Sequence, residues 1–185
     1  MQNYFLRAYT QGAPAHRVIV HIRELLTCCR ALSVPVLYSA QPPGQTQTQR
    51  GLLHDFWGAG PGVGPHARSD DTEIVAPLRP GAADTIVIKH RYSAFHETEL
   101  AELLAAAGRD QLMITGVYAH LGCLLTAADA FMSGIQPFLV ADAVADFDRG
   151  HHRRALQYAA SRCAVLATTD GALGAGSGTV LPTLR

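Results

Sequence analysis

The sequence predicts an α/β fold, a doubly wound parallel sheet with helices on both faces. Segments with helical periodicity alternate along the chain with short apolar segments. The short segments are nearly continuous apolar runs without a period of two, which is typical of parallel strands covered on both faces. A ligand of such a sheet binds beyond the carboxyl ends of the strands, so the residues after each predicted strand are candidates for a site.

Length, composition and charge exclude several classes of protein for this chain. The 185 residues suit one domain, and 48% hydrophobic with 16% charged residues argue against disorder. Fifteen basic residues balance fifteen acidic ones, which argues against a nucleic-acid or acidic-membrane partner. No apolar run approaches the ~20 residues of a membrane span, and the first residues do not resemble a signal peptide. We therefore expect a cytoplasmic protein.

The first half of the chain predicts one helix, one strand and a long excursion. Apolar residues recur at intervals of three and four over 15–32, which indicates an amphipathic helix. Residues 34–38 form a short apolar strand with a proline near its start. The segment 41–80 is rich in Gly, Pro, Gln and Thr, with one helical turn expected at 47–56. An excursion this long inside a compact domain is usually functional.

The second half continues the alternation of strands and helices. In order, it predicts a strand at 84–88, a helix at 97–107 ended by Gly108, a strand at 111–115, a helix at 120–132, a strand at 136–141, a helix capped by Asp148 and running to 161, and a strand at 163–168. The Gly-rich run after residue 170 reads as flexible. We expect a domain at 1–170 and a flexible tail or linker remnant at 171–185.

Cysteine and histidine patterns do not indicate a metal site. Cys28, Cys29, Cys123 and Cys163 form no C-x-x-C pair, so we expect four reduced thiols. The nine histidines are scattered and match no zinc pattern. The sequence therefore predicts no metal.

Three polar residues follow predicted strands, namely Gln41, Lys89 and Tyr118. A lysine in this position is either a solvated strand end or a buried ammonium group that binds an anion. Tyr118 lies in a turn before a helix, whose first N–H groups could bind a carboxylate. Asp142 and Asp146 follow another strand, and we interpret them as caps or loop anchors.

The long excursion adds Arg50 and Trp57 to the candidates. The arginine is either solvent-facing or a bidentate clamp for a carboxylate. The tryptophan, the only one in the chain, is either a core residue or the wall of a ring-sized pocket. The residues alone thus favour a small anionic ligand, for which a ring is one option.

Several longer motifs then narrow the function. MQNYF (1–5), LHDFWG (53–58), KHRYSAF (89–95), TGVYAH (115–120) and PFLVAD (137–142) occur in this order. Together they resemble the isochorismatase family over nearly the whole chain. The resemblance implies a Rossmann-like three-layer α/β fold and a hydrolase that cleaves the enolpyruvyl ether of isochorismate to pyruvate and 2,3-dihydro-2,3-dihydroxybenzoate in siderophore-type metabolism. The alternative is the phenazine-type hydrolase of 2-amino-2-deoxyisochorismate.

The resemblance also implies roles for single residues. Lys89 would orient a general acid and the substrate, and Trp57 would line the pocket. Gln41, Arg50, Tyr118 and the Gly122 backbone would hold carboxylates and ring hydroxyls. The resemblance implies no metal or organic cofactor. Apart from the substrate, the expected partner is a further copy of the chain in a homo-oligomer. Of the two substrates, the 2-hydroxy one is slightly favoured over the 2-amino one.

The wider superfamily includes cysteine hydrolases such as nicotinamidases. Their nucleophilic cysteine matches Gly122 here, and Cys123 is its neighbour, which points elsewhere on a helix. We therefore expect Cys123 not to act as a nucleophile, and an amide-cleaving function is weakened.

The chain departs from the family pattern at its start. The family's catalytic aspartate should immediately precede Met1, at the end of an apolar strand, and both are absent. We expect either a start further upstream or a degenerate copy that keeps the pocket as a binding module. The 185 residues by themselves are expected to catalyse poorly. His90 stands where relatives often have tryptophan.

Overall fold

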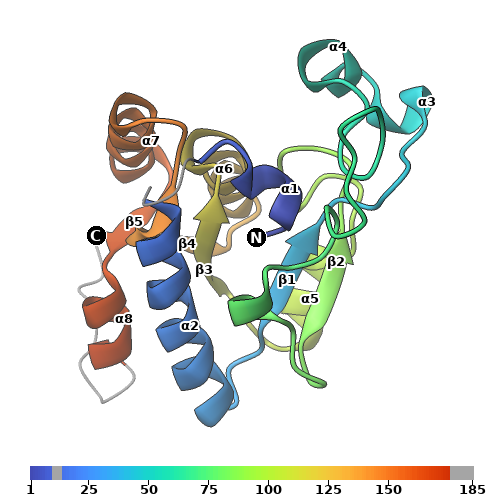
Figure 1. Ribbon diagram of the computed structural model, residues 1–185. Helices are drawn as coiled ribbons and strands as arrows, with labels where there is room; N and C mark the ends of the chain where they lie inside the picture. Colours follow the sequence, from blue (N-terminus) through green and yellow to red (C-terminus); the bar gives the residue numbers. More distant parts are fainter. Residues whose placement is uncertain (10–13, 176–185) are drawn as a thin grey trace.

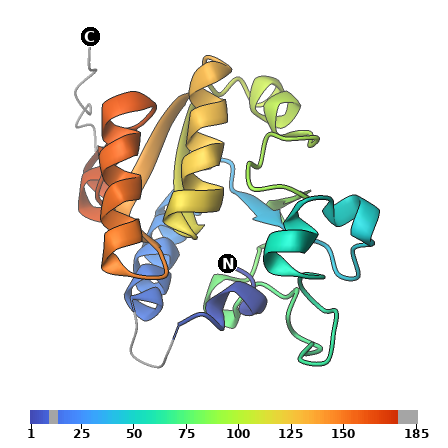
Figure 2. The same cartoon turned by 90° about the horizontal axis from the view of Figure 1, so that it is seen from above.

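The computed structural model describes residues 1–9 and 14–175 and confirms the α/β class. Five strands all pair in parallel within their sheets. They are β1 (Leu37–Ala40), β2 (Thr85–Ile88), β3 (Gln111–Val117), β4 (Gln136–Ala145) and β5 (Val165–Ala167). Helices cover both faces of the β3–β4–β5 sheet, with α2 (Ala15–Ala31) on one face and α6 (Leu124–Met132) and α7 (Arg149–Arg162) on the other (Figures 1 and 2).

The strands form two separate sheets. One has the order β1-β2 and the other the order β3-β4-β5. In Figure 1 the N-terminus lies between strands β1 and β3. In the described part of the chain they are not hydrogen-bonded to each other, so each has one edge without a neighbouring strand.

Helix α2 matches the predicted segment 15–32 because its apolar positions follow the helical period. Its buried residues are Ala15, Val18, Ile22 and Leu25. They pack against strand β4, where Val140 and Ala143 are fully buried. This contact forms the larger part of the core on that face.

Two predicted boundaries shift for local reasons. The strand predicted at 34–38 lies at Leu37–Ala40, because Ser33 turns the chain with φ +55° and pairing begins only where Val36 O accepts from Thr85 N at 3.0 Å. The helix predicted at 97–107 is α5 (Leu100–Ala106). It begins later because Glu97 has φ +53°.

The long excursion contains more structure than one turn. It holds α3 (Gln47–Arg50), α4 (Leu53–Trp57) and the 3-10 turn η1 (Ala76–Leu78). Gly51 divides the predicted turn at 47–56, because its φ of +54° is incompatible with a continuous helix. A short helix α1 (Asn3–Leu6) precedes α2.

The C-terminal part confirms one predicted cap and moves one boundary. Asp148 caps α7 by accepting from the backbone N–H of His151 at 2.9 Å. The predicted start of the tail, residue 171, lies inside α8 (Thr169–Ala175), because Ala172 and Leu173 pack against the core. The rest of the predicted tail, 176–185, lies outside the described residues. None of the described helices is both long and apolar enough to cross a bilayer.

Candidate active site

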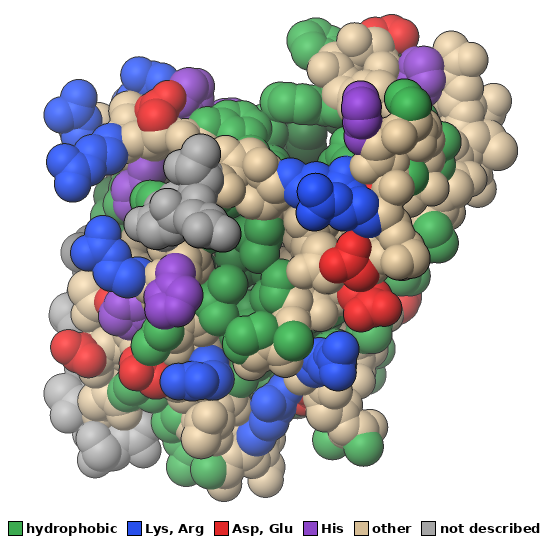
Figure 3. All heavy atoms as spheres, in the orientation of Figure 1, with side chains coloured by type: hydrophobic (Ala, Val, Ile, Leu, Met, Phe, Trp, Pro, Cys, Tyr) green, Lys and Arg blue, Asp and Glu red, His purple; other side chains and the backbone are tan. Residues whose placement is uncertain are grey.

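One cavity of about 810 Å³ lies between the two sheets, where residues along β1 and β3 line it, and it includes residues just beyond the carboxyl ends of β1 and β2. In the space-filling view, a hollow with hydrophobic side chains separates the α3–α4 lobe from the rest of the molecule (Figure 3). All six predicted site residues line the cavity, namely Gln41, Arg50, Trp57, Lys89, Tyr118 and Gly122. The chain thus brings together side chains from three separate regions of the sequence.

Arg50 is a buried cation, not a solvent-facing arginine. Helix α3 begins with a capping box at Thr46 and ends at Arg50, whose residue is only 2% exposed. Its guanidinium donates to Gln41 Oε1 at 2.7 Å and to Gly58 O at 2.9 Å. Burial lowers the pKa of Arg50, but arginine stays charged in proteins. Among the described residues no carboxylate lies within 4.0 Å of it, so the charge is free to bind an anion.

Gln41 is held in a network of glutamines. Gln2 brackets its backbone, accepting from Gln41 N at 2.9 Å and donating to Gln41 O at 2.8 Å. Gln45 donates to Gln41 Oε1 at 3.4 Å, and the oxygen of Gln45 lies 3.1 Å from His90 Nδ1. His90, the departure from the family pattern, therefore contacts the site through Gln45. Sequence reasoning missed Gln2 and Gln45, because a lone glutamine has no distinguishing pattern.

Lys89 is a partly buried lysine at the end of β2. Its backbone N–H donates to Ala40 O at 2.9 Å, which extends the β1–β2 pairing, and its Nζ donates to Tyr92 O at 2.7 Å. Burial lowers the pKa of Lys89 below its usual value. A Cβ atom on Gly122 would lie 3.5 Å from the Lys89 Nζ. The glycine therefore leaves room in front of the ammonium group.

An aromatic wall completes the cavity. The rings of Tyr118 and Phe147 lie 4.3 Å apart, those of Phe147 and Trp57 lie 6.1 Å apart, and Trp57 Nε1 donates to Tyr92 Oη at 2.6 Å. The hydroxyl of Tyr118 donates to Phe5 O at 2.6 Å, and burial raises the pKa of Tyr118 to about 12, so the phenol is neutral. Phe147 and Tyr92 were not among the predicted site residues; only their place just after a strand could have suggested them.

The turn before α6 differs from the predicted helix start. It is a π-helical turn, η2 (Ala119–Cys123). Three of its N–H groups have acceptors within the protein. His120 N donates to Asp146 Oδ2 at 2.7 Å, and the N–H groups of Leu121 and Cys123 both donate to Tyr118 O at 3.2 Å. These three groups are therefore not free for a ligand, contrary to the expectation from the sequence.

Strand β4 continues past the predicted 136–141, so Asp142 lies within it and only Asp146 follows it, but both aspartates act as anchors, as predicted. Asp146 also accepts from His120 Nδ1 at 2.6 Å, which ties the turn before α6 to the end of β4. Asp142 accepts from Thr169 N at 2.8 Å and thereby holds the start of α8.

Cys123 has the environment of an inert thiol. It is buried, and its Sγ lies 3.9 Å from Thr115 O. Burial raises the pKa of Cys123 to about 12, so the thiol is protonated at neutral pH and a poor nucleophile. The four cysteines are unpaired, as expected. Within residues 1–9 and 14–175, no group of three potential metal ligands gathers.

Comparison with known proteins gives a consistent result. Residues 1–171 match the family model of the isochorismatase domain. The chain is 49% identical to an isochorismatase of Bacillus subtilis, over 94% of this chain and 54% of the relative. It is also 49% identical to the phenazine biosynthesis protein PhzD1 of Pseudomonas aeruginosa, over 94% of this chain and 81% of the relative.

The fold comparison agrees. The crystal structure of an isochorismatase family protein from Desulfovibrio vulgaris superposes with a TM-score of 0.80 at 26% identity, covering 97% of this chain and 95% of the other. The chain spans about half the length of the Bacillus relative and most of the Pseudomonas one.

Proposed function

Because the chain belongs to the isochorismatase family, we propose that it hydrolyses the enolpyruvyl ether of isochorismate. The products are pyruvate and 2,3-dihydro-2,3-dihydroxybenzoate, a reaction suited to siderophore-type secondary metabolism. The observation that carries the proposal is an aromatic-lined cavity that holds two cations, Arg50 and Lys89, neither of which has a carboxylate within 4.0 Å in residues 1–9 and 14–175. A ring-shaped dicarboxylate fits both features.

In this proposal, different residues of the cavity bind different parts of the substrate. Arg50 and the amide of Gln41 hold one carboxylate, because the guanidinium donates in a fixed fork that matches a carboxylate. Lys89 holds the enolpyruvyl carboxylate and orients the proton donor. Trp57 and Tyr118 flank the ring, and the missing side chain at Gly122 leaves room for the enolpyruvyl group.

The reaction starts with a proton transfer to carbon. Protonation of the terminal methylene carbon gives an oxocarbenium ion, to which water adds with loss of a proton. The resulting hemiketal collapses, its bond to the ring oxygen breaks, that oxygen leaves as the ring hydroxyl, and pyruvate is released. The difficult step needs a well-placed general acid with a raised pKa.

The described residues around the cavity include no Asp or Glu side chain that could supply this proton. The aspartate expected ahead of Met1 therefore stays a prediction. If no such acid exists, the chain is the non-catalytic binding module that the sequence leaves open.

Two other activities are weighed against this one. The phenazine-type substrate, 2-amino-2-deoxyisochorismate, is the second candidate, because the chain is 49% identical to PhzD1 as well as to the Bacillus isochorismatase. Amide cleavage through a cysteine is disfavoured, because glycine occupies position 122 and the pKa of Cys123 is raised to about 12.

The test is pyruvate release from isochorismate, coupled to lactate dehydrogenase. Two purified proteins are compared, the 185-residue chain and a chain extended by the codons that precede Met1 in its gene. Release by either protein supports the vinyl-ether assignment, and release by the extended chain alone also supports the general acid ahead of Met1. If both are folded and neither releases pyruvate, the assignment fails.

We also propose a cytoplasmic, homo-oligomeric protein that needs no cofactor. Light scattering after size-exclusion chromatography measures the number of subunits. Activity that survives dialysis against a chelator supports the absence of a metal requirement.

A further inference from the structure

His90 lies behind the cavity wall, and we propose that it is a positioning residue, which acts through Gln45 to orient the ligand-binding amide of Gln41. The inference rests on the proposed function, because it adds a residue to that same site. His90 Nδ1 lies 3.1 Å from Gln45 Oε1, and Gln45 Nε2 lies 3.4 Å from Gln41 Oε1. Gln41 lines the cavity, whereas His90 and Gln45 do not. Any effect of His90 on a ligand therefore passes through other side chains.

The direction of each hydrogen bond in this network follows from Arg50. A guanidinium group only donates hydrogen bonds, so the Gln41 atom that lies 2.7 Å from Arg50 Nη1 must be the amide oxygen. The same oxygen faces the side chain of Gln45, which must therefore direct its NH₂ group toward it. The backbone oxygen of Pro42, 3.5 Å from Gln45 Nε2, requires the same orientation independently, because a carbonyl oxygen only accepts.

This orientation fixes the tautomer of His90. The Gln45 oxygen is the atom that faces the imidazole, and it only accepts, so His90 Nδ1 must carry a proton and donate it. An unprotonated Nδ1 would need the NH₂ group of Gln45 in front of it. The Gln45 oxygen would then face the oxygens of Gln41 and Pro42, which repel it. Neutral His90 is therefore held in its Nδ1–H form.

Both glutamines are buried, so the loss of the His90 donor has a consequence at the cavity. A buried amide oxygen without a donor is costly, and the Gln45 amide would turn to reach another one. Gln41 would then lose one of the two donors that hold its oxygen. Its NH₂ group, which has no acceptor among the described residues, would no longer be held ready for a ligand. Binding would have to order this group, which weakens affinity.

The position of His90 suits this role. It lies between Lys89 and Arg91, which both line the cavity, and its backbone oxygen accepts from Arg91 Nη1 at 3.1 Å. Its side chain contacts Gln45, which precedes it by 45 residues in the sequence. The hydrogen bond thus joins the segment after β2 to the segment before α3, and these two segments carry Lys89 and Gln41.

NMR of the full chain with isotope-labelled histidine tests the tautomer directly. At about pH 8, above the usual pKa of histidine, the chemical shifts of the ring atoms distinguish the Nδ1–H form from the Nε2–H form. The signals of His90 are those that are missing from the spectrum of His90→Asn. We expect the Nδ1–H form. The Nε2–H form would overturn the inference, whether or not the protein releases pyruvate.

Two variants of similar shape test the effect on the substrate, in whichever chain releases pyruvate. His90→Asn keeps an N–H donor close to the place of Nδ1, whereas His90→Leu removes it. We expect KM for isochorismate to rise about fivefold in His90→Leu, with kcat changed by less than about twofold, and to stay near the wild-type value in His90→Asn. The control is His16→Leu, the same replacement at an exposed residue of α2. Equal KM values in His90→Leu and His90→Asn would overturn the inference.

A double-mutant cycle tests whether His90 acts through Gln45. Gln45→Leu should raise KM by a similar factor, and His90→Leu should add little in that background, because the connection to Gln41 is already lost. Two effects that simply multiply, in proteins whose unfolding shows that they are folded, would contradict an action through Gln45.

A ligand that is not cleaved separates this inference from the proposed function. In titration calorimetry, benzene-1,3-dicarboxylate should bind His90→Leu with a dissociation constant about fivefold higher than it binds His90→Asn. This difference together with the Nδ1–H tautomer, without pyruvate from isochorismate, supports the inference and overturns the function. Release of pyruvate with equal behaviour of the two variants supports the function and overturns the inference.

Discussion

Arg50 has two properties that rarely occur together, near-complete burial and, among the described residues, the lack of an acidic partner. A buried guanidinium without a carboxylate is costly unless a ligand supplies one. Gly60 adapts the backbone to it, because a Cβ atom at that position would lie 2.8 Å from the Arg50 Cζ. Helix α3 and the backbone at Gly60 thus both accommodate the guanidinium group. For this reason we propose Arg50 as the main ligand-binding residue.

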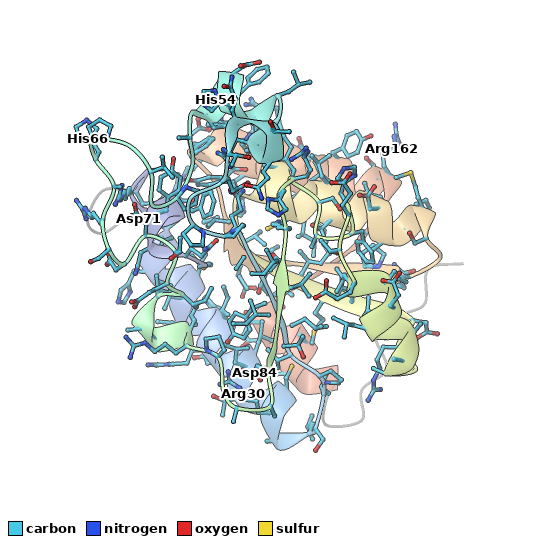
Figure 4. All side chains as sticks on the ribbon, turned by 90° about the vertical axis from the view of Figure 1, so that its right-hand side faces the viewer. Arg30, His54, His66, Asp71, Asp84 and Arg162 are labelled. Carbon is cyan, nitrogen blue, oxygen red and sulfur yellow. The ribbon has the colours of Figure 1, made fainter. Side chains whose placement is uncertain are left out.

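The first prediction concerns this residue. Arg50→Gln should lower kcat/KM about 100-fold, or about 2.7 kcal/mol, because the paired donors to a carboxylate are lost. Most of the change should appear in KM. Steady-state kinetics of pyruvate release measure it, with Arg162→Gln as the control at an exposed site away from the cavity (Figure 4). A variant with unchanged KM would exclude Arg50 from substrate binding.

The second prediction concerns the pH dependence set by Lys89. Burial lowers its pKa, so the ammonium form is lost at a lower pH than in an exposed lysine. If the ammonium group is required, kcat/KM should fall as pH rises through this lowered pKa, at a lower pH than an exposed lysine would give. Lys89→Met should be nearly inactive at every pH. A wild-type profile that stays flat up to the usual range of lysine would contradict this role.

The third prediction concerns Cys123. Because its thiol is buried and its pKa is about 12, iodoacetamide should label it far more slowly than Cys28 in the folded protein. Cys123→Ala should keep most of the pyruvate release. Mass spectrometry of labelled peptides gives the rates. Loss of an amidase activity in parallel with labelling of Cys123 would instead restore the cysteine-hydrolase reading.

At the scale of elements, an ion pair joins the end of α2 to the start of β2. Arg30 contacts Asp84, which also accepts from Gly81 N at 2.7 Å (Figure 4). Burial alone would raise the pKa of Asp84, but the bonds from Arg30 and Gly81 hold it below its usual range. The pair therefore contributes to stability above the usual pKa of an aspartate, and this contribution disappears as pH falls through the lowered pKa.

The fourth prediction follows from this sign. Asp84→Asn should reduce the free energy of unfolding at pH 7 by about 0.5–1 kcal/mol, a modest value because Arg30 is exposed. The difference from the wild type should shrink as the pH falls below the lowered pKa. Urea unfolding at several pH values measures it. A difference that grows toward acid pH would have the wrong sign for a paired carboxylate.

Sequence reasoning predicted elements better where the signal was local. The period of α2 and the cap of α7 depend on residues within one helix, and both were confirmed. The start of β1 and the split of the excursion at Gly51 depend on backbone angles that no apolar pattern indicates. The helix α8 depends on packing of Ala172 and Leu173 against a distant core, so a glycine-rich composition concealed it.

The residues of the candidate site were likewise predicted where the signal was local and missed where it was not. Lys89, Gln41 and Tyr118 were found because they follow strands, and the parallel topology brings strand ends together. The state of Arg50 could not be predicted, because its partners Gln41 and Gly58 lie outside its own helix. Phe147 joins the aromatic wall only through ring packing across separate elements.

At the scale of the whole molecule, stability should be uneven. Strand β4 pairs with β3 on one side and with β5 on the other, and Leu139 and Val140 are fully buried. The β1–β2 pair has no further neighbour in its sheet among the described residues. The two sheets therefore differ in how many partners protect their backbone.

The fifth prediction is that amide hydrogens of β4 exchange with solvent more slowly than those of β1 and β2. Hydrogen–deuterium exchange with mass spectrometry resolves the segments. Equal protection of both sheets would mean that the molecule opens only as one cooperative unit.

The free edges of β1 and β3 have a further consequence. Each presents a row of backbone donors and acceptors to the cavity between the sheets, where an extended polypeptide of almost any sequence can pair. Backbone hydrogen bonds do not depend on side-chain charge. Because the formal net charge of this chain is zero, electrostatic repulsion between copies gives little protection against such pairing. In the described part of the chain, the β1 and β3 edges can therefore accept a further strand, and association in concentrated solution depends on how well those two edges are shielded.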